Sequence, residues 1–64
     1  MNIQEMLKEL LSRGHTQRGI AVQIGTTQPT IFRAVNGADV RYELGKAIEN
    51  FYTQEVESDR LKSA

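Results

Sequence analysis

The sequence predicts an all-α fold, a small bundle of four helices with room for a fifth. Apolar residues recur every three or four positions along most of the chain, which is the spacing of one helix face. Glycines and small polar capping residues divide the chain into helix-sized segments, and no alternating strand pattern occurs. A chain of 64 residues without cysteine holds one domain, whose modest core must come from helix packing.

The first predicted helix contains Ile3 and ends near Ser12 to Arg13, and the second covers residues 17–24. Gly14 suits the left-handed conformation that follows a helix end, and Thr16 offers an N-cap hydroxyl to the next helix. Gly25 is placed to end that second helix. The side chains expected to face inward are Ile3, Met6, Leu7, Leu10 and Leu11 in the first helix, and Ile20, Ala21 and Ile24 in the second.

The third predicted helix runs from about Thr27 to Asn36. Thr27 is a candidate N-cap, and Pro29 falls in the first turn, where its missing N–H costs nothing. Asn36 and Gly37 both tolerate a left-handed backbone, so the helix is expected to end there. The inward side chains of this helix are expected to be Ile31, Ala34 and Val35.

The fourth predicted helix begins after Asp39, which is expected to be its N-cap, and continues to Thr53 or beyond. Its apolar stripe consists of Val40, Leu44, Ala47, Ile48 and Phe51. Residues 1–53 are therefore expected to form the domain. Residues 54–64 have few apolar anchors and are expected to form either a helical extension or a flexible tail.

Charge is unevenly distributed along the chain, although the net charge is zero. Residues 12–48 hold five basic and two acidic residues, whereas the segments on either side of them are mildly acidic. This pattern is compatible with one face that meets an anionic partner and another that meets solvent or protein.

Several classes of function have no support in the residues present. No cluster supplies a nucleophile with a base, paired acids or a phosphate-binding glycine loop, so no enzymatic activity is expected. The single His15 cannot build a metal site by itself, and no cofactor or small-molecule ligand is expected. The apolar runs are too short to cross a membrane and no secretion signal is recognisable, which predicts a cytoplasmic protein.

The most informative segment runs from Gln17 to Asn36. Two helices joined by a short turn at a steep angle need a small side chain at their crossing and a glycine where φ is positive. Ala21 and Gly25 meet these needs. Such a turn brings forward the N-terminal end of the second helix, whose polar side chains can then enter a DNA major groove.

Over about Leu7 to Phe51, the chain resembles the helix-turn-helix family of phage repressors and Cro-type regulators. The matching residues are Thr16, Gln17, Ile20, Ala21, Gly25, Thr27, Gln28, Ile31, Asn36 and Gly37, followed by the segment Tyr42 to Tyr52. The chain departs from the family pattern at Gly19, Thr26 and Ala34. The resemblance implies a lambda-repressor-like fold and a transcriptional repressor, from a phage or bacterium, that binds a palindromic double-stranded operator as a homodimer.

The resemblance assigns base contacts to the start of the third helix and to the residue one turn later, namely Thr27, Gln28, Pro29 and Arg33. The amide of Gln28 can pair with adenine, and Arg33 can pair with guanine, each contributing about 1–3 kcal/mol of discrimination. By helical phase Phe32 also faces outward. It is expected either to meet a thymine methyl or sugar or to be partly buried against the fourth helix.

Contacts to the DNA backbone are expected around this helix. Gln17 is assigned a phosphate contact at the start of the second helix, although it could simply cap that helix. The resemblance adds Asn36 and the backbone after Gly37. Position and charge alone add Arg18, Thr30, Arg41 and Lys46. The residues expected at the dimer contact are Phe51, Tyr52 and Val56, in a dimer that forms either in solution or only on DNA.

A second function from another class stays open. The chain could be a helix-turn-helix-derived module that binds a regulator or a polymerase subunit and not DNA. Zero net charge and the acidic C-terminal third favour this alternative. The polar side chains of Thr27, Gln28 and Arg33 favour DNA, because an apolar docking face would be expected on a protein-binding helix.

Overall fold

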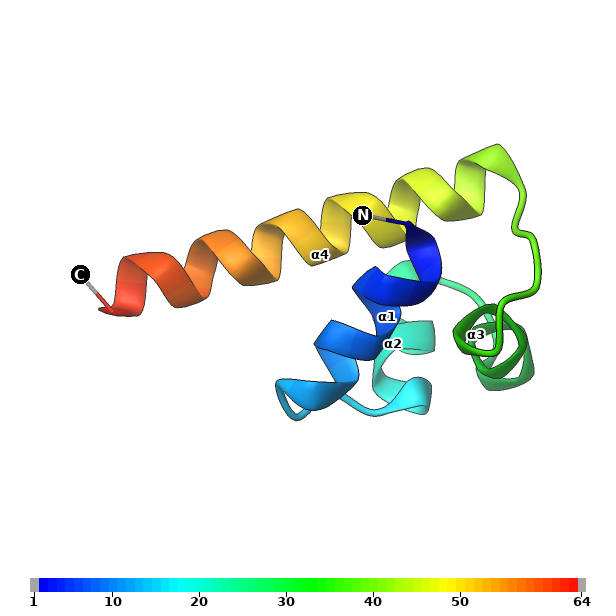
Figure 1. Cartoon of the computed structure of the whole chain (residues 1–64), viewed down its shortest axis with the longest axis horizontal. Helices are drawn as coiled ribbons and strands as arrows, with labels where there is room; N and C mark the ends of the chain where they lie inside the picture. The colour runs from blue at the N-terminus through cyan, green and yellow to red at the C-terminus, as the bar shows by residue number, and fades with distance from the viewer. Residues whose placement is uncertain (1, 64) are drawn as a thin grey trace.

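The protein is all-helical, as predicted, with four helices (Figure 1). The computed structural model describes residues 2–63, and their side chains through residue 61. No strand and no fifth helix occurs among these residues. The helices are α1 (Ile3–Ser12), α2 (Gln17–Ile24), α3 (Gln28–Val35) and α4 (Tyr42–Ser63).

Local capping sets the ends of α1 and α2 where the sequence predicts them. Thr16 is the N-cap of α2, and its Oγ1 accepts a hydrogen bond from the backbone N–H of Gly19 at 2.9 Å. Gly14 and Gly25 have φ angles of +103° and +89°, the left-handed conformation expected after each helix. The boundary between these two helices therefore follows from residues that are neighbours in the sequence.

The start of α4 differs from the prediction. Residues 38–41 are not helical and the helix begins at Tyr42, so Asp39 is not its N-cap. Val40 instead packs against Gly45, where an added Cβ would lie 3.4 Å from Val40 Cγ2 and 3.8 Å from Ile3 Cδ1. Val40 therefore lies in the connection before α4, two residues before the helix begins, and not in the apolar stripe of the helix where the sequence predicts it.

The C-terminal end of the described chain is helical. Residues 54–63, for which the sequence left a helical extension and a flexible tail open, belong to α4. Position 64 lies outside the described residues. With 22 residues, α4 is about 33 Å long, close to the 35 Å longest dimension of the molecule. Figure 1 shows its last turns projecting beyond the other three helices.

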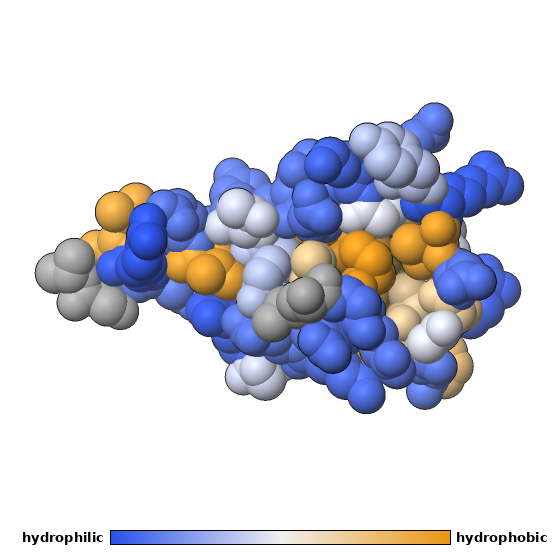
Figure 2. Space-filling model, turned by 45° about the horizontal axis from the view of Figure 1, so that its top comes forward, coloured by the Kyte–Doolittle hydropathy of each residue, from blue (hydrophilic) through white to orange (hydrophobic). Residues whose placement is uncertain are grey.

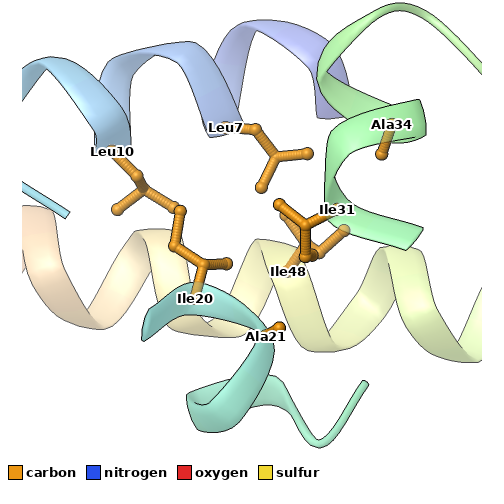
Figure 3. Packing of buried hydrophobic residues seen from close by; sticks show 7 residues of the cluster. All are labelled: Leu7, Leu10, Ile20, Ala21, Ile31, Ala34 and Ile48. Atoms are coloured by element: carbon orange, nitrogen blue, oxygen red, sulfur yellow. The ribbon is translucent and has the colours of Figure 1, made fainter. Parts of the chain in front are cut away.

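The core lies where the four helices meet (Figure 3). Both α3 and α4 pack mainly against α1 and α2. The buried side chains are Leu7, Leu10, Ile20, Ala21, Ile31, Ala34 and Ile48, all of which the sequence predicts to face inward. Ile31 and Ala34 are the buried residues of α3, so the opposite side of that short helix is left to solvent.

A polar network joins the end of α1 to the middle of α4. Glu9 Oε2 accepts hydrogen bonds from Arg13 Nη2 at 3.0 Å and from the Tyr52 hydroxyl at 3.1 Å. Arg13 also pairs with Asp59 of α4. Burial, together with the hydrogen bond to Glu9, raises the pKa of Tyr52. The hydrogen bond to Glu9 also raises the pKa of Arg13.

His15, in the connection between α1 and α2, makes a second link to α4. Its Nε2 lies 2.8 Å from Glu55 Oε1, and its ring meets the Phe51 ring edge-on with centroids 5.3 Å apart. Together with Arg13, it adds polar links to the part of α4 beyond Ile48, where Phe51 and Tyr52 also pack against the core.

The face of the molecule drawn in Figure 2 is mostly hydrophilic. Figure 2 shows apolar surface over part of the body and, separately, near the projecting end of α4, the end that carries Leu61. Within residues 2–63, no helix combines the length and the apolar character that crossing a membrane requires.

Candidate nucleic-acid interface

The three residues Gly25, Thr26 and Thr27 connect α2 to α3. The backbone N–H groups of Gly25 and Thr26 both donate to the carbonyl of Ala21, at 2.8 and 2.9 Å, which closes the end of α2 as φ of Gly25 turns positive. Thr27 takes the N-cap position of α3 without a capping hydrogen bond, and its Oγ1 lies 2.8 Å from Thr30 Oγ1. This short connection brings the start of α3 close to the start of α2.

The exposed side of α3 holds the residues predicted to contact bases. Thr27, Gln28, Pro29, Phe32 and Arg33 are all exposed. Pro29 lies in the first helical turn, where no backbone bond is lost. Phe32 is 52% exposed and is not among the side chains packed on the core. The ring therefore faces outward and is not buried against α4, the other position expected for it.

Gln17 and Gln28 form a direct link between the starts of α2 and α3. Gln28 Nε2 donates to Gln17 Oε1 at 2.5 Å, and both side chains lie at the surface. Both residues are predicted to contact DNA, but the bond between them is not predicted from the sequence, because the bond depends on how α2 and α3 are placed relative to each other. The pairing leaves the Gln28 carbonyl oxygen and the Gln17 amino group, one acceptor and one donor, free of this bond.

Three arginines around α3 make no ion pair. Among the residues that the structure describes, no carboxylate lies within 4 Å of Arg18, Arg33 or Arg41. Arg33 and Arg41 line one hollow between α3 and the segment that leads into α4, together with Thr30 and two acidic residues, Asp39 and Glu43. The predicted backbone contacts Thr30 and Arg41 are thus brought together with Arg33.

Lys46 and Asn36, two further residues predicted to contact the DNA backbone, bind other groups of the same chain. Lys46 Nζ lies 3.2 Å from Glu49 Oε1 one turn further along α4, with both side chains about half exposed. Asn36 Nδ2 donates to the Phe32 carbonyl at 2.8 Å and so helps to close the end of α3. Gly37 is exposed and has a φ of +97°, so its backbone conformation favours glycine.

The residues predicted for a dimer contact lie on α4 between its middle and its projecting end. Phe51 and Tyr52 are half-buried and pack against the core of the same chain. Val56 is also half-buried. The structure therefore gives Phe51 and Tyr52 a packing role within the protomer.

Tyr42 is a surface residue that the sequence reasoning did not include in the candidate interface. It is 80% exposed at the first position of α4 and follows Arg41 directly. Helical phase could have identified it, because position 42 is turned well away from the buried Ile48 on the same helix.

Among the described residues, no three His, Cys, Asp or Glu side chains are grouped so that they could hold a metal ion.

Comparisons of the chain with protein-family models, with curated proteins and with solved structures find no match. The candidate interface therefore rests on the geometry and chemistry of this chain alone.

Proposed function

We propose that the protein is a sequence-specific double-stranded DNA-binding regulator in which α2 and α3 form a helix-turn-helix and α3 is the recognition helix. The observation that carries this proposal is the exposed side of α3, where Gln28, Phe32 and Arg33 face solvent while Ile31 and Ala34 fix the opposite side in the core. An eight-residue helix is about 12 Å long, which fits a major groove about 12 Å wide.

The chemistry of this side suits base edges. An exposed glutamine amide can pair with adenine, an exposed arginine can pair with guanine, and an aromatic ring can contact a thymine methyl. Arg18, Arg33 and Arg41, for which the described part of the chain offers no ion pair, would supply positive charge to the adjacent phosphates. Gln17, which already accepts a hydrogen bond from Gln28, would contact a phosphate and orient Gln28 at the same time.

By its resemblance, we place the protein with the phage repressor and Cro-type regulators, acting in the cytoplasm of a bacterial or phage-infected cell. One short helix offers few base contacts, so we propose a homodimer on a palindromic operator. Phe51 and Tyr52 are partly used within the protomer, which leaves Val56 as the residue of this set for the dimer contact. Sedimentation with and without operator DNA would test whether the dimer needs DNA.

Selection from a pool of random duplexes, followed by sequencing, tests the proposal. We expect a roughly palindromic site to be enriched by the wild type, with selectivity relaxed in Gln28→Ala and in Arg33→Ala by about 1–3 kcal/mol at the affected base pairs. Gln54→Ala and Lys8→Ala are matched controls, because both residues are exposed and neither belongs to the proposed DNA or dimer contacts. These controls should select the same site as the wild type.

A helical protein-interaction module is the second candidate. It is favoured by two exposed apolar side chains, Val22 on α2 and Phe32 on α3, which are 73% and 52% exposed. If the wild type enriches no duplex even at low salt, the DNA proposal fails and this alternative takes its place.

A further inference from the structure

Side-chain amides tie α3 to the other helices at both of its ends. At the start of α3, Gln28 bonds to Gln17 of α2. At the end of α3, Gln4 Nε2 of α1 donates to the Val35 carbonyl at 3.0 Å, in a partly buried contact. The first tie joins two side chains that are both proposed to contact DNA. The second uses the backbone of α3 and a residue outside the proposed contact set.

The Val35 carbonyl takes its donor from another helix because it lies at the end of α3. The last carbonyls of a helix have no partner within the helix. The two preceding carbonyls accept hydrogen bonds from the chain that follows α3. The Gly37 N–H donates to the Ala34 carbonyl at 3.1 Å, and the Ala38 N–H donates to the Arg33 carbonyl at 3.0 Å. The carbonyl of Val35 is completed from α1.

The Gln4 amide lies beside Gly37 at this helix end. A Cβ added at Gly37 would be 3.5 Å from Gln4 Nε2 and 3.8 Å from Gln4 Cδ, so the amide packs beside the turn and bonds to the helix. The contact therefore fixes the direction as well as the distance between α1 and the end of α3, since hydrogen bonds prefer a nearly linear geometry.

We propose that Gln4 is a positioning residue that sets the angle of α3 on the DNA, an inference that rests on the proposed function. Apolar contacts of Ile31 and Ala34 hold α3 in place but are not directional. The bond between Gln28 and Gln17 joins two exposed side chains that would also contact DNA, whereas the Gln4 bond is partly buried and holds the backbone of α3. It lies next to the turn that carries Phe32 and Arg33, so these side chains depend on it most.

The test uses Gln4→Met, which keeps the length of the side chain but lacks the N–H donor, and Gln54→Met as a matched control on the exposed surface of α4. Dissociation constants are measured for the selected duplex and for its single-base variants, at a temperature where each protein is fully folded. We expect Gln4→Met to weaken binding to the selected duplex at least fivefold and to lose discrimination at the base pair assigned to Arg33. Discrimination at the base pair assigned to Gln28 should be retained, and Gln54→Met should match the wild type within twofold.

Two outcomes would overturn the positioning role. In the first, Gln4→Met keeps both affinity and discrimination within twofold of the wild type. In the second, affinity falls equally for all duplexes with discrimination unchanged, which a general loss of structure would produce. Failure of the wild type to enrich any duplex overturns the proposed function itself and is distinguished because it is seen before any variant is compared.

Discussion

Ile48 is the residue through which we expect α4 to be held to the other three helices. It is fully buried, and it enters the cluster formed by side chains of α1, α2 and α3 (Figure 3). Replacing Ile48 by alanine removes three buried carbons, at about 0.8 kcal/mol for each, and leaves a cavity. The expected loss in the free energy of unfolding is therefore about 2–5 kcal/mol.

This loss is large for a chain of this size. At about 0.05–0.15 kcal/mol per residue, a protein of 64 residues is expected to have a total stability of about 3–10 kcal/mol. Ile48→Ala should therefore leave the protein marginally folded. Ile48→Val removes one carbon and should cost about 0.5–1.5 kcal/mol, which keeps the measurement within range.

Urea unfolding followed by far-ultraviolet circular dichroism gives these free energies. Leu61→Ala is the control, because Leu61 is 69% exposed on the projecting end of α4 and should change stability by less than about 0.5 kcal/mol. A loss below about 1 kcal/mol for Ile48→Ala would refute the docking of α4 through this residue. An equal loss for both alanine variants would show that the projecting end is covered in solution.

Three further predictions follow from single contacts. Thr16→Ala removes the acceptor for the Gly19 N–H and should cost about 1 kcal/mol in urea unfolding, whereas Thr16→Ser should restore most of it. Burial and the bond to Glu9 raise the pKa of Tyr52, so the stability that this tyrosine contributes is complete below about pH 10 and is lost as pH rises through the raised pKa. Above about pH 10, the midpoint temperature of thermal unfolding should therefore fall less steeply with pH for Tyr52→Phe than for the wild type. Parallel pH profiles for the two proteins would contradict the assignment. If Phe32 contacts a thymine methyl, replacing thymine by uracil in the duplex should weaken binding to the wild type in competition assays. The same replacement should leave binding to Phe32→Ala unchanged. Equal binding of the wild type to both duplexes would exclude this contact.

The helix boundaries in the first half of the chain were predictable because they depend on local chemistry. The Thr16 hydroxyl reaches a backbone N–H three residues away, and Gly14 and Gly25 adopt positive φ at the positions where helices end. The start of α4 was not predictable in this way. There, Val40 and the distant Ile3 both lie against Gly45, and the helix begins beyond the expected Asp39 cap.

The candidate interface divides in the same manner. Helical phase alone, counted from Ile31 and Ala34, predicts that Phe32 and Arg33 face outward, and both are exposed in the structure. The bond between Gln28 and Gln17, and the tie from α1 to the end of α3, require the relative placement of three helices. Nothing in the spacing of these residues along the chain carries that information.

Acidic side chains gather on the distal half of α4, where Glu55, Glu57 and Asp59 fall within five residues. Two of them lie against groups from outside the helix, Glu55 against His15 and Asp59 against Arg13. Arg13 and His15 both belong to the connection between α1 and α2. We therefore expect this connection and the distal turns of α4 to open together, because the same two contacts hold both.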